Sequence, residues 1–318
     1  MHRIVVVIVN YKTPDLVVQC LETLDAELAR GRDAAVVVDN ASGDGSIDTI
    51  EDCVTRNGWG DWVRIVRASV NAGFSAGNNL GIQSAPAEAY LLLNSDTLVR
   101  PGAVETLWQA LMDMPEAGLV APRLTWEDGE PQISAFRCPT PLTEFVHAAG
   151  TGPISQLLER HTVAMPLQDA PHDAGWTSFA CVLIRAGVIE DAGLMDEGYF
   201  LYYEDIDYCR KATAKGWRIV YCPGATVVHL RGGSGPVKAL ARARKLRPRY
   251  FYESRARYYT TFYGRGGLVM ANLAWMLGRG IAWTRETFGR KEPHTAPGEW
   301  KAIWTRGRAF VTTQEHGV

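Results

Sequence analysis

The feature that most constrains the fold is a repeated pattern in which a short apolar run ends in polar or glycine-rich residues. The pattern occurs at 4–9, 35–38, 63–66 and 90–93. Unbroken apolar runs are typical of strands buried on both faces of a parallel sheet. Helix-like segments separate the runs, so the order strand, helix, strand predicts an α/β fold with a doubly wound, mostly parallel sheet.

The remaining elements are expected at less regular intervals. Thr13 and Pro14 are typical of a helix start, and that helix should run to about Arg30. Further segments are predicted as a helix from Pro101, a strand at 118–120, a hairpin at 124–134, a long and partly mobile loop region at 137–175, a strand at 178–184, a helix ending near 215, and two short strands at 218–221 and 226–230.

Composition narrows the class of protein. The 318 residues are 47% hydrophobic and 21% charged with a net charge of −2, as in soluble globular proteins, and this balance predicts no nucleic-acid partner. Six cysteines without a C-x-x-C pair suggest neither a zinc site nor a redox motif. The chain begins with too few residues before its first apolar run for a signal sequence, which favours a cytoplasmic location. No run is long enough to span a bilayer.

Polar side chains follow three of the predicted strands, where ligands bind in open α/β sheets. Asp96, alone at its strand end, is suited to hold a divalent cation that grips a diphosphate, although a helix cap or turn residue is an open alternative. Asp39 can accept a hydrogen bond from a base or a ribose, and Tyr11, next to Asn10, can stack on the base.

The segment 71–79 is rich in small and amide residues, and its glycines would let the backbone approach a ligand closely. Asn78 lies on the helix that follows. A dinucleotide site is not indicated, because no G-x-G-x-x-G follows the first strand. The sheet is therefore expected to bind a nucleotide other than NAD.

An acidic cluster, Glu204, Asp205 and Asp207, opens a helix after an aromatic approach. Acids in a first helical turn are often there for the helix dipole alone. Adjacent acids also project about 100° apart, so one can act as a general base while others orient it. His229 follows a strand and precedes Arg231, which favours a metal or phosphate role over a structural one.

Six segments in this order resemble the motif set of the family 2 inverting glycosyltransferases, in particular the rhamnosyltransferase-like branch that builds bacterial cell-surface polysaccharides. They are Val7 to Tyr11, Val38 to Ser42, Asn71 to Asn79, Leu92 to Asp96, Phe200 to Tyr208 and His229 to Ser234. The resemblance covers about residues 3–235. It implies the GT-A fold, a Rossmann-like sheet flanked by helices, with a nucleotide-sugar half at about 1–123 and an acceptor half at about 124–235.

The resemblance also implies roles for single residues. Asn94 to Asp96 matches the D-x-D motif with its first acid replaced, so Asp96 and His229 would hold Mg²⁺ or Mn²⁺. Asp205 matches the catalytic base, with Glu204 and Asp207 beside it. The nucleotide sugar would be bound by Asn10, Tyr11, Asp39, Asn71, Gly73, Phe74, Asn78, Asn94, Ser95 and Arg231.

The expected reaction is a single displacement with inversion. The first expected donor is dTDP-L-rhamnose and the second a UDP-sugar, and the acceptor is a lipid-linked or growing glycan. A sugar-nucleotide pyrophosphorylase is disfavoured because the loop after the first strand has no glycine. A degenerate nucleotide-sugar-binding scaffold of a polysaccharide assembly complex is the other alternative, and the intact Asp96, Asp205 and His229 argue against it.

The C-terminal segment, residues 236–318, differs in composition. Lys and Arg alternate with Tyr and Phe between 238 and 265, and a short apolar run follows at 267–278. This composition is typical of an element that lies on an anionic membrane surface. A solvated basic helix packed on the main domain and a homodimer contact are the alternatives. The protein is therefore expected at the cytoplasmic face of the membrane, bound peripherally.

Overall fold

The computed structural model describes residues 1–230, 237–289 and 292–306, and its chain divides into two compact units. Unit 1 comprises Met1–Phe136, Ala164–Asp196 and Asp205–Ser234, and unit 2 comprises Arg137–Val163, Glu197–Glu204 and Gly235–Val318. The expected boundary near 235 is therefore only one of several, because 137–163 and 197–204 group with the C-terminal segment.

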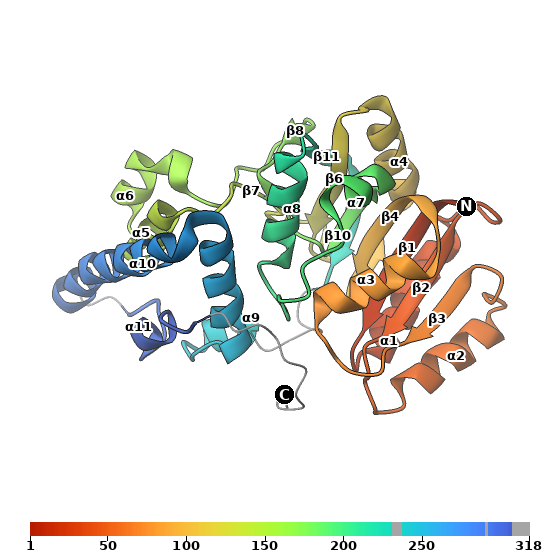
Figure 1. The fold of residues 1–318 in the computed structure, drawn as a ribbon, viewed down its shortest axis with the longest axis horizontal. Coiled ribbons are helices and arrows are strands. Elements are labelled where there is room, and N and C mark those ends of the chain that lie inside the picture. The colour runs from red at the N-terminus through yellow and green to blue at the C-terminus, as the bar shows by residue number, and fades with distance from the viewer. Residues whose placement is uncertain (231–236, 290–291, 307–318) are drawn as a thin grey trace. The chain divides into compact units, whose positions relative to one another are not determined.

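Unit 1 is built on one mixed sheet with the strand order β3-β2-β1-β4-β10-β6-β11-β5 and with β8 beside β11 (Figure 1). The strands are β1 (His2–Asn10), β2 (Ala34–Asp39), β3 (Val63–Arg67), β4 (Ala87–Asn94), β5 (Thr97–Val99), β6 (Ala117–Thr125), β8 (His172–Asp173), β10 (Cys181–Arg185) and β11 (Arg218–His229). The pairs among β1 to β4 and the β6–β11 pair are parallel, whereas β10, β5 and β8 pair antiparallel with their neighbours. The predicted mostly parallel α/β sheet is confirmed.

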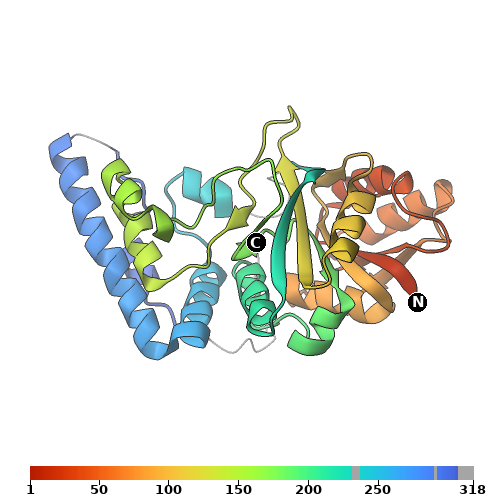
Figure 2. The ribbon, with the colours of Figure 1, turned by 90° about the horizontal axis from the view of Figure 1, so that it is seen from above.

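Alternating residues of the central strands feed two separate cores. Ile4, Val6 and Ile8 face one core, into which α1 (Pro14–Asp25), α2 (Ser46–Arg56) and α4 (Ala103–Asp113) pack. Val5 and Val7 face the other, together with α3 (Phe74–Ser84), α7 (Ala186–Ala192) and α8 (Glu204–Ala214). The sheet lies between these two helical layers, which Figure 2 shows from above.

Helix α3 approaches the sheet very closely. A Cβ built on Gly77 would lie 2.9 Å from a methyl group of Val9, and one on Gly81 would lie 2.3 Å from a methyl group of Val7. Only glycine allows this spacing between helix and strand. Gly77 and Gly81 therefore allow the packing of α3 on β1.

Several predicted elements differ in detail. Residues 218–229 form one strand with a bulge between Cys222 and Thr226, so the two predicted short strands are a single strand. The predicted hairpin at 124–134 is reduced to one bridge between Thr125 and Pro131. A separate two-stranded sheet forms from β7 (Ala135–Phe136) and β9 (Trp176–Thr177) instead. Helix α1 ends at Asp25, short of the predicted Arg30.

Unit 2 is helical. It contains α5 (Pro141–Ala149), α6 (Gly152–Leu157), a 3₁₀ turn at Glu159–His161, α9 (Val237–Arg242), α10 (Arg249–Gly289) and α11 (Glu299–Ala302). The predicted loop at 137–175 is wrong over 141–157. Thr140 and Thr143 form a reciprocal cap at the start of α5, and Pro141 occupies its first turn. Helix α10 consists of two helical segments joined at Gly264, whose φ of 68° interrupts the helix.

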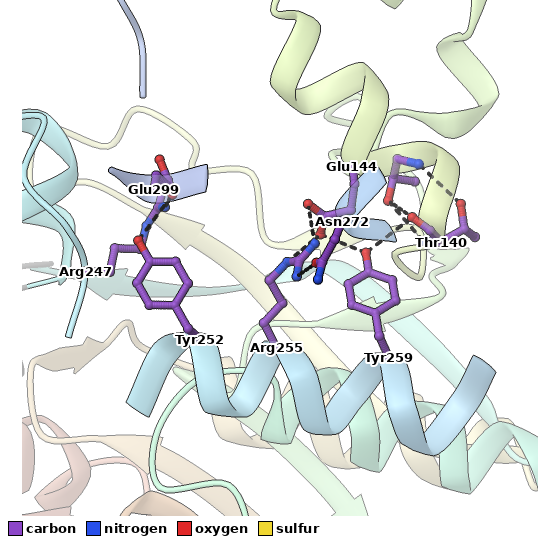
Figure 3. Close-up of polar contacts among 9 residues, drawn as sticks. Thr140, Glu144, Arg247, Tyr252, Arg255, Tyr259, Asn272 and Glu299 are labelled. Carbon is purple, nitrogen blue, oxygen red and sulfur yellow. Dashed lines mark hydrogen bonds and ion pairs between the residues drawn. The ribbon is translucent and has the colours of Figure 1, made fainter. Parts of the chain in front are cut away.

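A buried polar cluster joins α5 to both halves of α10 (Figure 3). Arg255 donates from Nε to Glu144 Oε1 at 3.2 Å and from Nη1 to Asn272 Oδ1 at 2.7 Å. The Tyr259 hydroxyl donates to the same Glu144 oxygen at 2.8 Å. Farther along, a Cβ on Gly278 would lie 2.5 Å from the Phe145 carbonyl oxygen, so the two helices are in close contact there as well.

The two halves of α10 expose different surfaces. Tyr250, Tyr252, Tyr258 and Tyr259, which contributed to the expectation of a membrane or dimer surface, are buried in unit 2. The exposed residues of 266–289 instead are all uncharged and include several large apolar side chains. They are Val269, Met270, Leu273, Met276, Leu277, Ile281, Trp283 and Phe288. Among the described residues, no helix has both the length and the hydropathy needed to cross a membrane.

Candidate active site

The carboxyl ends of β1, β2 and β4 bring the predicted nucleotide-binding residues of unit 1 together. Asn10 pairs with Asp39 across the β1–β2 ladder, and Val9 pairs with Asn94 across the β1–β4 ladder. Because all three strands are parallel, their polar ends meet at one edge of the sheet. The sequence prediction that these residues share a site agrees with this register.

Asp39 is held in a fixed orientation by its neighbours. Asn10 donates from Nδ2 to Asp39 Oδ1 at 2.8 Å, and the Ser42 hydroxyl donates to the same oxygen at 2.6 Å. Asn10 is fully buried and also donates to Ser42 at 3.1 Å. Its side chain therefore orients Asp39, and the contact of Asn10 with the nucleotide stays a prediction. Ser42 was not predicted to belong to the site, although it lies in the quoted motif.

A short amide chain links the end of β2 to the loop before α3. Asn40 donates from Nδ2 to Asn71 Oδ1 at 2.9 Å and to the Gly73 carbonyl at 3.1 Å, and Asn71 Oδ1 also accepts from the Gly73 amide. Gly73 has φ 96° and ψ −179°, a conformation that is essentially restricted to glycine. Asn40 was missed, because its partners lie far away in the sequence.

Two residues predicted to bind the nucleotide sugar point into the protein. Asn78 is buried and donates to the carbonyl of Phe74 within its own helix at 2.9 Å. Phe74 packs against the core on the α3 side of the sheet. The neighbouring Asn79 exchanges hydrogen bonds with the backbone of Met195 at 2.9 and 3.0 Å. These contacts hold α3 in place beside the site, and nucleotide-sugar binding by Phe74 and Asn78 stays a prediction.

The two predicted metal ligands lie side by side. Asp96 Oδ1 is 3.4 Å from His229 Nε2, and both side chains are buried. The antiparallel pairing of β5 with β11 sets His229 opposite Thr97 and joins the Leu230 amide to the Asp96 carbonyl at 2.9 Å. Gln132 fixes the strand end by donating to the His229 carbonyl at 2.8 Å. Gln132 was not predicted, since nothing in its local sequence indicates this partner.

A carboxylate oxygen beside an imidazole nitrogen is a donor set that Mn²⁺ accepts, and Mg²⁺ prefers oxygen ligands alone. Within the described residues, no group of three or more His, Cys, Asp and Glu side chains could hold a metal by itself. Asp96 and His229 therefore fit a cation that takes its other ligands from a diphosphate and from water.

Ser95 and Asn94 complete the end of β4. The Ser95 hydroxyl lies 3.1 Å from the Thr13 hydroxyl. Thr13 precedes α1 as predicted, but its side chain makes no capping hydrogen bond to the helix. Asn94 is half-buried, and its Oδ1 has no hydrogen-bond partner among the described residues. Tyr11 is also half-buried, with Lys12 Nζ 5.2 Å from the centre of its ring. Arg231 lies outside the described residues.

Asp205 is tied to the same edge of unit 1 through two adjacent backbone groups. The Phe179 amide hydrogen-bonds to the Asp205 carboxylate, and the carbonyl of Ala180 accepts from the Asn94 amide at 2.9 Å. Desolvation raises the pKa of Asp205 to about 7, against the opposing hydrogen bonds from the amides of Ile206, Asp205 and Phe179. A carboxylate that titrates near neutrality is suited to general base catalysis.

The two other acids of the cluster differ from Asp205 in their surroundings. Asp207 is fully buried, with its Oδ2 2.7 Å from Lys211 Nζ, and Lys211 is also 3.7 Å from Asp196. This ion pair gives Asp207 a structural role within α8. Glu204 is buried at the first position of the helix. Asp205 is therefore the acid whose surroundings best suit a base.

Comparison with known proteins identifies the family and the fold. The family model described as "Glycosyltransferase like family 2" matches residues 2–252. The chain is 31% identical over 156 residues to an N-acetylglucosaminyl-diphospho-decaprenol L-rhamnosyltransferase of Mycobacterium tuberculosis, covering 48% of this chain and 50% of the relative. It is 26% identical over 228 residues to a low-salt glycan biosynthesis hexosyltransferase of Haloferax volcanii, covering 70% and 66%. The match to the first relative thus spans half of that protein's length.

Solved structures share the fold at low sequence identity. GalNAc-T7, solved with UDP, GalNAc and Mn²⁺, superposes with a TM-score of 0.57 at 14% identity, covering 94% of this chain and 56% of that one. A mannosyltransferase of Pyrobaculum calidifontis, solved with GDP-Man and Mn²⁺, gives 0.53 at 16% identity, covering 95% and 83%.

Proposed function

The chain belongs to glycosyltransferase-like family 2 and has the GT-A fold, and on this premise we propose that it transfers a sugar from a nucleotide donor to an acceptor hydroxyl with inversion. The observation that carries the proposal is the single sheet edge of unit 1. There, Asp39 ends β2, Asp96 follows the end of β4 beside His229 at the end of β11, and Asp205 is tied to the same edge through residues 179–180.

In this proposal the donor binds along the carboxyl ends of β1, β2 and β4. Tyr11 stacks on the base, and Asp39, oriented by Asn10 and Ser42, accepts a hydrogen bond from the base or the ribose. Asp96 and His229 would hold a divalent cation, which would supply positive charge at the leaving diphosphate.

Asp205 acts as the general base of a single displacement. Its carboxylate takes the proton of the acceptor hydroxyl while that oxygen forms a bond to the anomeric carbon of the donor. The bond from the anomeric carbon to the diphosphate oxygen breaks on the opposite face, so the configuration inverts. The reaction forms no covalent intermediate with the enzyme.

The names of two relatives support the substrate classes. One acts on a lipid-linked diphosphate sugar with L-rhamnose, and the other is a hexosyltransferase of glycan biosynthesis. We therefore take dTDP-L-rhamnose as the first donor and a UDP-sugar as the second. The acceptor is a lipid-linked or growing cell-surface glycan.

A lipid-linked acceptor requires contact with a membrane, and we propose that the protein binds the cytoplasmic face peripherally. The uncharged exposed face of 266–289 supports this placement, because apolar side chains on one side of a helix can enter the headgroup region. The proposed contact therefore lies in the second half of α10, not in the tyrosine-rich first half.

The test is donor turnover. Wild-type protein is incubated with Mn²⁺ and each of dTDP-L-rhamnose and a set of UDP-sugars, and release of the nucleoside diphosphate and the anomeric configuration of the product are followed by NMR. We expect one donor to be consumed with inversion. Retention of configuration, or no turnover of any donor in the presence of lipid-linked and glycan acceptors, would contradict the proposal.

A further inference from the structure

Unit 2 contains a groove of about 460 Å³ between the second half of α10 and the segment 293–300. Trp275 is buried on the groove wall, whereas Trp283 and Trp300 are 60% and 53% exposed. Met276, Pro293 and Pro297 complete the apolar lining. Met276 and Trp283 also belong to the exposed apolar face of α10, so the groove opens onto that face.

The lining is mainly apolar, and its polar side-chain groups are the Thr295 hydroxyl, three indole N–H groups and the guanidinium of Arg279. Arg279 is engaged by Glu286 through two contacts of 2.8 and 3.0 Å. The two prolines have no amide donor. A sugar or a peptide carries more polar groups than this lining can satisfy, which is costly, whereas a hydrocarbon chain has none to satisfy.

The surroundings of the groove favour a negatively charged headgroup. The stretch 237–306 contains four acids against fifteen Lys and Arg. All four acids form ion pairs with arginines, namely Glu253 with Arg249, Glu286 with Arg279, Glu292 with Arg244 and Glu299 with Arg247. The unit therefore has a net positive charge, which attracts phosphate groups.

We infer that this groove binds the isoprenoid chain of a lipid-linked acceptor whose phosphate remains outside in the cationic surroundings. The inference rests on the proposed function, which supplies the acceptor class. A concave groove holds one chain along its length, whereas the flat face of a bilayer contacts an exposed helix surface. The groove thus selects the acceptor, and the exposed face of α10 contacts the membrane around it.

Two glycines of α10 provide a matched test. A Cβ on Gly280 or on Gly266 would meet nothing within 4 Å, and neither glycine has a positive φ, so either position accepts a side chain without strain. Gly280 lines the groove and Gly266 does not. Gly280→Leu should therefore fill the groove, and Gly266→Leu adds the same group to the same helix elsewhere.

The probe is farnesyl phosphate, titrated calorimetrically below its aggregation concentration into the full-length protein. We expect the wild type and Gly266→Leu to bind equally, and Gly280→Leu to bind at least tenfold more weakly. Farnesol should bind more weakly than farnesyl phosphate to the wild type, and inorganic phosphate alone should not bind detectably. Circular dichroism and thermal unfolding verify that both variants are folded.

Equal affinity of the two variants, whether unchanged or reduced alike, would overturn the inference. A second result would also overturn it: Gly280→Leu loses binding to phosphatidylglycerol vesicles but binds farnesyl phosphate as the wild type does. That result would assign the groove to membrane phospholipid. Failure of the proposed function is distinguishable, because farnesyl phosphate binding requires no sugar donor. Nucleotide binding with Mn²⁺, measured on the same variants, reports the donor site separately.

Discussion

Four carboxylates of unit 1 lie in different surroundings, and these differences set their roles. Asp39 is oriented by short hydrogen bonds, and Asp96 lies beside an imidazole. Asp207 is buried in an ion pair. Asp205 is held by backbone amides in a poorly solvated position, which raises its pKa to about 7. In the proposed function, chemically identical groups thus divide into nucleotide binding, metal binding, structure and proton transfer.

The raised pKa of Asp205 predicts the pH dependence of activity. The base acts in its ionised form, so turnover should rise as pH increases through about 7. Asp205→Asn should lower turnover by about 10³-fold or more while donor affinity stays within a factor of about two, because general base catalysis contributes on the order of 10²–10⁴. Initial rates from pH 5.5 to 8.5 and donor titrations measure both. Appreciable activity in Asp205→Asn would move the base role to Glu204.

The raised pKa of Asp205 also predicts that the stability of the protein changes with pH in the opposite direction to its activity. A carboxyl whose pKa is higher in the folded state is destabilising when ionised, so its contribution becomes less favourable as pH rises from the unfolded value towards about 7. Asp205→Asn cannot ionise. The difference in melting temperature, Asp205→Asn minus wild type, should therefore increase from pH 5 to pH 8.

Residues at strand ends could be predicted from sequence, because an apolar run that stops at a polar side chain is a local signal. Asn40, Asn79 and Gln132 could not, since each bonds to backbone or side chains far away in the chain. The hydrogen bonds of Asn10 and Asn78 within the protein could not be predicted from sequence either. Their residue types suit a ligand, but burial and hydrogen bonds to neighbours direct them inward.

At the scale of elements, apolar runs and hydrophobic periodicity located β1, β2, β3, β4 and β6 and the helices α1, α4 and α8 of unit 1, whereas the short strands β5 and β8 and helix α7 were missed. The helices at 141–157 were missed, because α5 buries its apolar residues against α10 and the segment is dense in Pro, Gly and His. The break in β11 was predicted from Pro223 and Gly224, which the strand accommodates as a bulge.

The contact of α3 with β1 gives a prediction at this scale. Gly81→Ala would set a methyl group 2.3 Å from Val7, so it should destabilise the protein by about 1–3 kcal/mol despite its higher helix propensity. Gly280→Ala, with open space around its Cβ, should stabilise by about 0.5–1 kcal/mol. Urea unfolding of both variants measures this difference in sign, and a stabilised Gly81→Ala would contradict the packing.

The buried ion pair of Arg255 in α10 with Glu144 in α5 gives a second prediction at the scale of elements. Burial alone would raise the pKa of Glu144, but the charge and hydrogen bond of Arg255 outweigh it and lower the pKa. Arg255→Met leaves the carboxylate buried without its cation and should cost about 3–5 kcal/mol. The pKa of Glu144 should then be raised, so the loss should shrink at low pH as the carboxyl protonates. Unfolding at pH 4.5 and pH 7.5 tests this, and Glu144→Gln in the Arg255→Met background should recover part of the loss.

For the whole molecule, the proposed membrane contact depends on the exposed apolar face of α10. Leu273 and Leu277 are 50% and 68% exposed on that face. Leu273→Glu with Leu277→Glu should abolish sedimentation with phosphatidylglycerol vesicles, because the charges would enter the headgroup region and meet anionic lipid. Leu157→Glu, at an 83% exposed leucine of α6, is the control and should sediment like the wild type.

Two results would contradict this assignment. Sedimentation of the double variant at wild-type levels would place the membrane contact elsewhere. Conversion of a dimeric wild type to a monomer by the same substitutions, seen by light scattering without lipid, would assign the face to a second copy of the chain.

The central claim is that Asp96 and His229 bind a nucleoside diphosphate through a divalent cation. The most direct measurement is calorimetric titration of dTDP and UDP, each with Mn²⁺ or with a chelator, into the wild type and Asp96→Ala. Asp173→Ala, at an exposed acid of β8, is the control. We predict that one nucleotide binds only with Mn²⁺, that Asp96→Ala loses at least tenfold in affinity, and that the control is unchanged. Metal-independent binding of equal strength in all three proteins would contradict the claim.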